Sequence, residues 1–280
     1  MTGDSGRDSL GRRATSFSEV AGLYDRARPG YPEDAVRWLA GDVPGDVVDL
    51  GAGTGKLTGT LVALGHRVTA VEPLAEMRAQ LAERLPGVRC VEGSAEAMPL
   101  PDASADVVTV AQAFHWFDHE PALAEIARVL RPGGVLAIAW NIRDEREEWV
   151  ARLSDIIGAE HMGRDAVEAA LAVGGLFRPP ACAEFRQATS LARAGLLELV
   201  RSRSHCIVRA PRERAAILEQ VERLYDAHAD GSGLSLPYRV ECYRAERQSP
   251  RPPPGTCDPG PMSRRGQAPL PSAEPRRGGR

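Results

Sequence analysis

The sequence predicts an α/β fold in which a parallel sheet is doubly wound, with helices on both of its faces. Two observations predict it. Between residues 46 and 140, short apolar runs alternate with longer amphipathic stretches, the pattern of strands and helices in a parallel sheet. The first of these strands leads into a glycine-rich run from Gly51 to Gly55, and Glu72 lies about 20 residues beyond it.

The expected elements follow in chain order. Residues 16–40 predict one or two short helices around the turn at 28–32. The alternating region predicts strands near 46–50, 67–72, 88–92, 105–111 and 134–140, and helices near 54–64, 74–84 and 119–130. Charged segments that favour helices follow at 144–158 and 162–173. The remaining chain predicts a strand near 183–190, helices near 194–203 and 211–228, and a final strand near 235–244.

The glycines have a physical reason. A strand that turns sharply into a helix needs residues that tolerate positive φ, and a ligand pressed against that backbone leaves no space for a Cβ atom. Free N–H groups at the start of the helix can bind an anionic group. Glu72, at the end of the next strand, can accept hydrogen bonds from ribose hydroxyls. The alternative is an ordinary glycine turn, with Glu72 a solvated strand-end residue.

Two phosphate-binding motifs fail on spacing. A dinucleotide fingerprint needs glycine at its sixth position, where this chain has Lys56. A P-loop needs glycine at the position of Leu50 and Ser or Thr at the position of Leu57. A nicotinamide oxidoreductase is therefore disfavoured. Glycines at alternate positions suit a ligand that carries an amino-acid carboxylate.

Residues 46–140 resemble the class I S-adenosylmethionine-dependent methyltransferases. The resemblance rests on the glycine run, on Glu72, and on two later segments, Glu92–Asp102 (EGSAEAMPLPD) and Leu130–Leu136 (LRPGGVL). It implies a Rossmann-like, mostly parallel sheet of seven strands. The last two strands would complete this sheet, with one antiparallel strand near the C-terminus, at the sheet edge.

Two flanking segments narrow the resemblance. Tyr24–Pro32 (YDRARPGYP) and Ala111–Asp118 (AQAFHWFD) are similar to the small-molecule branch of methyltransferase type 11, which includes trans-aconitate methyltransferase-like enzymes. The resemblance implies S-adenosylmethionine as donor, S-adenosylhomocysteine as product and no metal. The donor-binding residues that it implies are Tyr24, Arg28, Asp49, Gly51, Ala52, Gly53, Gly55, Glu72, Pro73, Met77, Ser94, Ala95 and Gln112.

Several of these residues have a structural alternative. Asp49 binds the donor's ammonium or caps the turn, and Met77 contacts adenine or belongs to the core. Arg28 pairs with a carboxylate of donor or substrate, or with a neighbouring acidic residue of its own helix. Ser94 stands where many relatives carry Asp, so its hydroxyl would contact adenine without charge assistance.

The acceptor is expected beyond the fourth strand. Here Gln112 ends the strand and His115 and Trp116 follow in the loop. His115 is the candidate catalytic base if the acceptor is a hydroxyl or amine, and it positions the acceptor if that is a carboxylate. The alternative is that His115 and Trp116 only pack the loop onto the sheet. By resemblance, Tyr31 and Tyr238 join them as substrate-binding residues.

The 280 residues predict a single enzyme domain over 16–247, with a donor-binding core at 46–140 and a substrate-side portion at 141–247. Residues 1–15 are expected to be mobile. Residues 248–280, rich in Pro, Arg and Gly, are expected to be disordered because they cannot bury enough apolar surface. Arginines in this tail either contact an anionic partner or have no role.

Composition limits the partners. The formal charge of −3 gives no general attraction to nucleic acid, and no apolar stretch is long enough for a membrane span or signal peptide. The five cysteines are widely spaced, which argues against a disulfide framework and a zinc site. We expect a cytoplasmic protein that binds neither nucleic acid nor membranes; monomer and homodimer both stay open.

The expected function is methylation of a small molecule on oxygen, with a carboxylate as one option. Carbon or nitrogen methylation of a secondary-metabolite intermediate is the enzymatic alternative. A third reading is a catalytically silent protein that binds S-adenosylmethionine and acts through a partner. The departure at Ser94 and the arginine-rich tail leave room for it. The sequence does not identify the acceptor.

Overall fold

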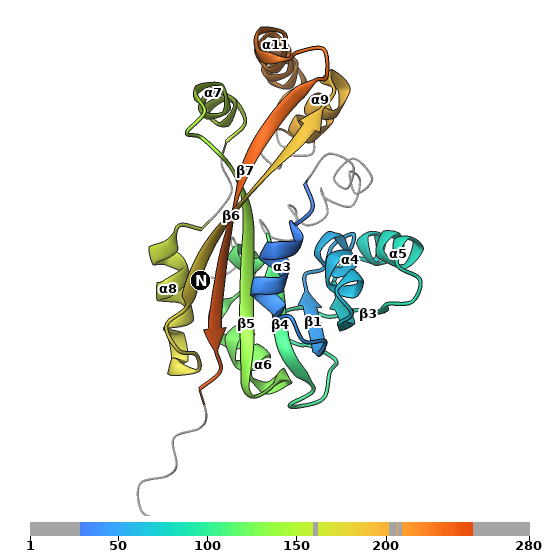
Figure 1. Cartoon of the computed structure of the whole chain (residues 1–280), viewed down its shortest axis with the longest axis vertical. Helices are drawn as coiled ribbons and strands as arrows, with labels where there is room; N and C mark the ends of the chain where they lie inside the picture. Colours follow the sequence, from blue (N-terminus) through green and yellow to red (C-terminus); the bar gives the residue numbers. More distant parts are fainter. Residues whose placement is uncertain (1–28, 159–161, 202–205, 207–208, 249–280) are drawn as a thin grey trace, which may run out of the picture. The chain divides into compact units, whose positions relative to one another are not determined.

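The computed structural model describes residues 29–158, 162–201, 206 and 209–248 (Figure 1). By its internal contacts the chain divides after Ser249, and the unit described here is the one that ends there. The predicted mobile N-terminus at 1–15 and, apart from Gln248, the predicted disordered tail lie outside the described residues. So do Tyr24 and Arg28, two of the expected donor-binding residues.

A seven-stranded sheet organises the unit, with the strand order β3-β2-β1-β4-β5-β7-β6. Its strands are β1 (Asp46–Leu50), β2 (Arg67–Val71), β3 (Arg89–Val91), β4 (Ala105–Ala111), β5 (Leu130–Arg143), β6 (Ala181–Leu191) and β7 (Leu234–Glu246). The pairs among β1 to β5 are parallel, whereas β7 runs antiparallel to both β5 and β6. The predicted mostly parallel, doubly wound sheet is therefore confirmed.

The expected place of the antiparallel strand was wrong. β7 does not lie at the edge: it pairs with β5 on one side and with β6 on the other, so β6 forms the edge. The reason is that β7 forms hydrogen bonds on both of its sides, to β5 and to β6, which leaves β6 at the edge of the sheet. Their ladder continues to the pair Leu191 and Leu234, past the end of β5 at Arg143.

The described α-helices lie within the predicted intervals to within a residue, whereas the short helices η1 and η2 were not predicted. The described helices are α3 (Glu33–Ala40), α4 (Lys56–Ala63), α5 (Ala75–Arg84), η1 (Phe114–Trp116), α6 (His119–Val129), α7 (Glu148–Ile157), α8 (Arg164–Leu171), η2 (Val173–Gly175), α9 (Arg193–Arg201) and α11 (Pro211–His228). Helix α11 begins and ends where the sequence predicts. Its first residue, Pro211, has the φ that the first helical turn needs.

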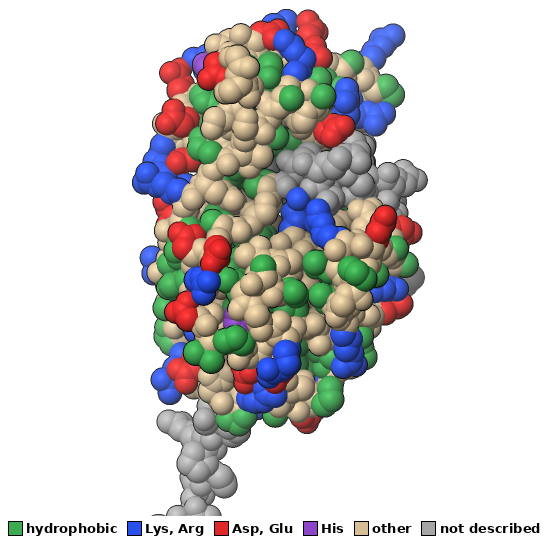
Figure 2. Space-filling view, turned by 45° about the vertical axis from the view of Figure 1, so that its right-hand side comes forward, with side chains coloured by type: hydrophobic (Ala, Val, Ile, Leu, Met, Phe, Trp, Pro, Cys, Tyr) green, Lys and Arg blue, Asp and Glu red, His purple; other side chains and the backbone are tan. Residues whose placement is uncertain are grey.

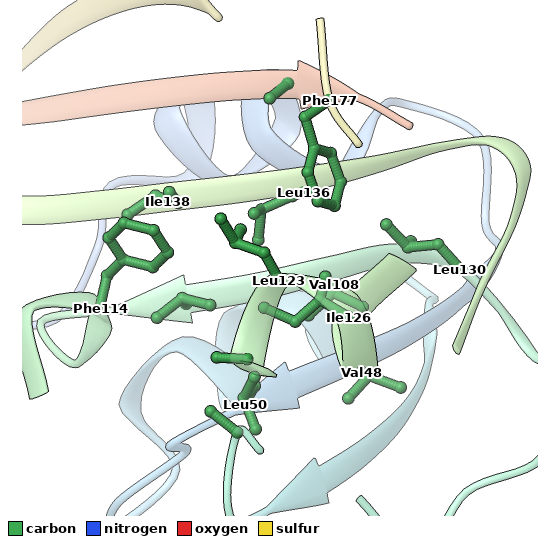
Figure 3. Packing of buried hydrophobic residues seen from close by; sticks show 14 of the residues in the cluster. Val48, Leu50, Val108, Phe114, Leu123, Ile126, Leu130, Leu136, Ile138 and Phe177 are labelled. Carbon is green, nitrogen blue, oxygen red and sulfur yellow. The ribbon is translucent and has the colours of Figure 1, made fainter. Parts of the chain in front are cut away.

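Side chains that alternate along the strands build two cores, one on each face of the sheet. Val107 of β4 packs with α3 and α4, whereas its neighbour Val108 packs with α6 and α8. Figure 3 shows Leu123 and Ile126 of α6 lying against Val108 and the other labelled strand residues. This alternation fixes which strand residues face each core. Because β1, β2 and β4 run parallel, their carboxyl ends lie at one edge of the sheet.

A third apolar cluster lies where the β6–β7 ladder extends past β5. It joins α7, α9 and α11 to the ends of β6 and β7 (Figure 1), and we call these three helices the cap. Leu153, Leu196 and Val221, one from each helix, are fully buried in it. The cap therefore has its own core, separate from the two cores of the sheet.

On the face seen in Figure 2, acidic and basic side chains are interspersed with hydrophobic ones. This agrees with the small formal charge of −3. Among the described residues, no helix is both long and apolar enough to cross a membrane.

Candidate functional site

The glycine run makes a tight turn between β1 and α4. Gly51, Gly53 and Gly55 have φ values of 69°, 56° and 85°, all in the left-handed region that favours glycine. The N–H groups of Gly51 and Ala52 both donate to the carbonyl of Val71, over 2.8 and 3.2 Å, which ties the turn to the end of β2. The conformation that the spacing predicts is present.

The three glycines differ in the space around their Cα atoms. A Cβ atom at Gly51 would lie 2.9 Å from Ala113 Cβ, and one at Gly55 would lie 3.0 Å from Leu81 Cγ. At Gly53 an added Cβ would meet nothing within 4 Å, because Gly53 borders two cavities. Gly51 and Gly55 are therefore glycine for close packing as well as for φ, whereas Gly53 leaves free space for a ligand.

The first cavity, here called the Glu72 cavity, lies between the ends of β1, β2 and β4. Most of its walls are apolar, and Glu72 and Glu96 are its charged residues. Its lining residues are Leu50, Gly51, Gly53, Glu72, Pro73, Leu74, Met77, Gly93, Ser94, Ala95, Glu96, Ala111, Gln112, Ala113, Trp116 and Phe117. An apolar slot with a single deep carboxylate fits a flat ring joined to a sugar.

Glu72 is held in place by backbone groups. Its two carboxylate oxygens accept hydrogen bonds from the N–H groups of Gly53, at 2.9 Å, and Leu74, at 3.0 Å. The residue is only 5% exposed, and this burial raises the pKa of its carboxyl group. The bond to Gly53 links the carboxylate directly to the glycine turn, so Glu72 sits where a ribose on that turn would lie.

Asp49 is buried at the end of β1. Its carboxylate accepts hydrogen bonds from the hydroxyls of Thr58 in α4, at 2.6 Å, and Thr109 in β4, at 3.0 Å. Burial raises the pKa of Asp49 to about 6. Asp49 therefore joins helix to sheet, and it also borders the second cavity. The hydrogen bonds that Asp49 accepts from Thr58 and Thr109 come from α4 and β4 rather than from the glycine turn, and binding of the donor's ammonium stays a prediction.

The second cavity, here called the Tyr238 cavity, lies beside the first and shares Gly51, Gly53, Ala111 and Gln112 with it. Its other lining residues come from the N-terminal segment, the sheet and the cap: Pro29, Tyr31, Asp49, Ala52, Thr54, Lys56, Leu57, Asn141, Leu199 and Tyr238. Lys56 is the only lysine of the chain and, among the described residues that line the two cavities, the only cationic one.

Gln112 lies where the two cavities meet. Its φ is 58°, a left-handed conformation that is uncommon for residues other than glycine and that concentrates at functional sites. Two bonds hold it there: its N–H donates to the carbonyl of Ala139 at 2.9 Å, and its side-chain amide donates to the carbonyl of Asn141 at 3.0 Å. The strained backbone is thus fixed by the neighbouring strand β5.

The loop after Gln112 forms the short helix η1. Phe114 is fully buried in the core beside α6, and the three residues that follow it, 115–117, are half-buried. Trp116 lines the Glu72 cavity. His115 lies with its ring 4.8 Å from that of Trp116, but it is not among the described residues that line either cavity. The structure therefore brings Trp116, but not His115, to the lining of the Glu72 cavity.

Most of the expected site residues come together. Asp49, the glycines Gly51 and Gly53, Ala52, Gln112, Tyr31 and Tyr238 border the Tyr238 cavity, and Glu72, Pro73, Met77, Ser94, Ala95 and Trp116 border the Glu72 cavity. Met77 is also 4% exposed, so it belongs to the core as well. Gly55 is the described donor-binding candidate that borders neither cavity; it packs against α5.

Sequence reasoning missed Lys56, Asn141, Leu199 and Glu96. Lys56 was visible as the single lysine of the chain directly after the glycine run. Asn141 and Leu199 lie about 90 and 145 positions beyond that run and are brought in by β5 and α9, which no local spacing predicts.

The chain matches a known family over part of its length. The family model of a methyltransferase domain, type 11, matches residues 48–138. An uncharacterised methyltransferase of Mycobacterium tuberculosis (strain ATCC 25618 / H37Rv) is 43% identical over 233 residues, which cover 82% of this chain and 95% of that protein. A malonyl-[acyl-carrier protein] O-methyltransferase of Pectobacterium atrosepticum is 37% identical over 131 residues, covering 45% of this chain and 51% of that protein.

Solved structures agree with the fold. A protein of Anaeromyxobacter dehalogenans, assigned as a type II methyltransferase, superposes with a TM-score of 0.57 at 29% identity, covering 79% of this chain and 97% of that one. A protein of Anabaena variabilis, assigned to an antibiotic biosynthesis pathway, gives a TM-score of 0.58 at 23% identity and covers 75% and 95% of the two chains.

Proposed function

The chain belongs to the class I S-adenosylmethionine-dependent methyltransferases, and we propose that it methylates a small molecule on oxygen, with a carboxylate as the acceptor group. The donor follows from the family. Two features of the site fit it: the open space over Gly53 and the carboxylate of Glu72 beside that space. The acceptor is the proposal.

The donor would occupy both cavities. Its adenosine suits the apolar Glu72 cavity, with the ribose at Glu72, and its methionine part suits the glycine turn, with the ammonium near Asp49. The donor supplies a methyl group already activated by a sulfonium charge. The chain has to align the acceptor with that methyl group and exclude water from it.

The observation that carries the proposal is the composition of the Tyr238 cavity. Leu199 and Tyr238, which are 0% and 2% exposed, wall it from the cap side, which favours a small acceptor shielded from water. The titratable side chains among its described lining are those of Tyr31, Asp49, Lys56 and Tyr238. Histidine is not among them, and Asp49 is assigned to the donor's ammonium, so an acceptor that is already a nucleophile at neutral pH fits best.

A carboxylate is such a nucleophile, whereas an alcohol or an ammonium group must first lose a proton. The match to an O-methyltransferase of malonyl-[acyl-carrier protein] over part of the chain supports oxygen as the acceptor atom. That no metal takes part, that the protein is cytoplasmic and that it binds neither nucleic acid nor membranes stay predictions.

The test begins with donor binding. Calorimetry with S-adenosylmethionine should give micromolar binding, and NADH, the control ligand, should give none. Acceptors are then screened by release of S-adenosylhomocysteine, using small carboxylic acids beside their matched amides and alcohols. We expect turnover with acids, also in the presence of a chelator. Turnover confined to amines, alcohols or activated carbon would contradict the proposed acceptor. Donor binding without turnover on any acceptor would favour the silent binder.

A variant of His115 provides a second test of the proposed acceptor. If the acceptor is a carboxylate, His115→Asn should keep kcat within about threefold, because no proton has to be removed. Loss of about a hundredfold or more, together with loss of the acid limb of the pH profile, would make His115 a general base and contradict the proposal.

A further inference from the structure

Two side-chain amides from different strands converge on one backbone carbonyl, that of Gly30. The amide nitrogen of Asn141 in β5 donates to it at 3.0 Å, and that of Gln187 in β6 donates to it at 2.9 Å. The amide of Gln187 also donates to the side-chain oxygen of Asn141 at 2.6 Å. An amide nitrogen carries two hydrogens, so Gln187 can make both bonds at once.

The carbonyl belongs to the segment that walls the Tyr238 cavity at its N-terminal side. Pro29 and Tyr31, the two neighbours of Gly30, both line that cavity. Gly30 itself lies outside every described helix and strand, and a Cβ atom placed on it would meet nothing within 4 Å. The space around the Cα of Gly30 is therefore open, and the two amide hydrogen bonds tie its carbonyl to β5 and β6.

The same amides reach the two other parts of the site. The backbone carbonyl of Asn141 accepts the hydrogen bond from Gln112, the strained residue between the cavities. Gln187 lies on β6, which runs on to Leu191 and into the cap (Figure 1). One cluster therefore joins the N-terminal wall, the methyl-transfer edge of the sheet and the strand that carries the cap.

We propose that Asn141 and Gln187 are positioning residues that hold the segment Pro29–Tyr31 against the donor and thereby retain it in the site. The inference rests on the proposed function, because it assumes that the donor's methionine part occupies the Tyr238 cavity. Holding the wall lowers the dissociation constants of donor and product. Once the donor is bound and the wall is closed, the methyl transfer itself does not involve these amides.

Gln187 is the better position for a test. It is not among the described residues that line the cavities, whereas Asn141 is. A change of the Gln187 side chain therefore reaches the ligand through its neighbours, which are Gly30, Asn141 and its β7 partner Tyr238. Gln187→Glu keeps the shape of the side chain but removes both donated hydrogen bonds. Gln248→Glu is the matched control, because Gln248 also donates one 2.9 Å bond to a carbonyl, that of Phe177, away from both cavities.

The experiment measures the affinity of the full chain for S-adenosylmethionine and S-adenosylhomocysteine by calorimetry, and KM and kcat by turnover. We expect Gln187→Glu to weaken both ligands about tenfold and to raise KM for the donor similarly, with kcat at saturating donor within about twofold. Gln248→Glu should leave the affinities unchanged. Gln187→Arg, which can again donate to both oxygens, should restore most of the affinity.

Equal affinities in Gln187→Glu and Gln248→Glu would overturn the proposal while leaving the proposed function intact. A loss confined to kcat, with affinity unchanged, would also overturn it. A wild-type chain that binds no S-adenosylmethionine would refute the proposed function and this inference together. If Gln187→Glu does not fold, Gln187→Met, which keeps the length without a donor, replaces it in the same comparison.

Discussion

Gly53 is the residue at which the site can be tested most directly. Replacement by Ala puts a methyl group into the space reserved for the donor, so we expect donor affinity to fall at least about tenfold, about 1.4 kcal/mol. Gly41→Ala is the control, because Gly41 also has positive φ and free space around its Cα but borders neither cavity.

Both variants place alanine at positive φ, which lowers stability in each, and more so at Gly41, whose φ of 90° and ψ of 166° lie in a region almost confined to glycine. Calorimetry with the donor and thermal unfolding therefore separate the two effects. Equal donor affinity in the two variants would mean that the donor does not lie over Gly53.

Asp49 predicts a pH dependence of donor binding. Its pKa is raised by burial to about 6, so it loses its charge as pH falls through that value. If the carboxylate binds the donor's ammonium, affinity should be about tenfold weaker at pH 5 than at pH 8, as for any single group that must be ionised. In Asp49→Asn, affinity should be low and this dependence absent.

The raised pKa of Asp49 changes the stability of the fold in the opposite sense: as pH falls, donor binding should weaken while the free energy of unfolding increases. A carboxyl group whose folded pKa is raised binds its proton more tightly in the folded state, so Asp49 destabilises the fold above pH 6 and this cost disappears as pH falls toward 4. Weaker binding at pH 5 is therefore not explained by unfolding through Asp49. Calorimetry from pH 5 to 8, with unfolding measured alongside, checks both signs.

The sequence predicts residues of the site well where they are close along the chain. Gly53 and Glu72 are 19 positions apart, and the βαβ unit that separates them has a fixed geometry, so their contact follows from spacing. The placement of His115 outside the lining of both cavities could not be predicted, because the sequence indicates a loop at 114–116 and not the short helix η1.

At the scale of elements, the position of α9 beside the Tyr238 cavity predicts that the cap contributes to binding of the acceptor. Leu199 and Leu196 are both fully buried in the cap cluster, but only Leu199 lines the Tyr238 cavity. Changing either to Ala should destabilise the chain by about 2–5 kcal/mol. Leu199→Ala alone should raise KM for the acceptor about three- to tenfold, because the wall recedes from the substrate.

Steady-state kinetics at saturating donor, with both variants checked for folding by circular dichroism, measure this difference. Equal KM values for the acceptor would show that α9 does not contact the substrate. The acceptor would then have to bind away from the cap.

The elements themselves were predictable to different degrees. Helix α11 has strong local signals, an initial proline and a long charged surface, and its bounds agree with the expectation. Strand β5 was expected at 134–140 but runs from Leu130 to Arg143. The regular pairing with β4 and β7 begins at Val135, close to the expected start. Before it the strand has one pair, Leu130 with Ala105, across an irregular register, and Gly133 has a φ of 75°. That early pair is set by distant residues, so the sequence does not indicate it.

At the scale of the whole molecule, the described elements and both cavities are formed within residues 29–248. We therefore expect a chain ending after Gln248 to bind the donor and turn over within about twofold of the full chain, because nothing in the described site is removed. Calorimetry and the acceptor assay measure this. Loss of turnover with donor binding kept would assign residues 249–280 a part in acceptor or partner binding.

The position of β7 is also a property of the whole sheet. The sequence indicates a late strand, but whether that strand lies at the edge depends on which neighbour accepts its second row of hydrogen bonds. Because β7 pairs with β5, it carries Tyr238 to the end of β5, opposite Arg143, and Tyr238 and Asn141 line the same cavity. The resemblance implied the strand and its direction; its place in the sheet required the structure.

The single lysine makes this chain simple to label. Amine-selective reagents can react with the side chain of Lys56 and with the α-amino group, and Lys56 borders the Tyr238 cavity. A fluorophore attached there would report from inside the site without an engineered cysteine. Conversely, the extent of acylation at Lys56, read by mass spectrometry of one peptide, would serve as a footprint of occupancy and rank unlabelled acceptors in a mixture.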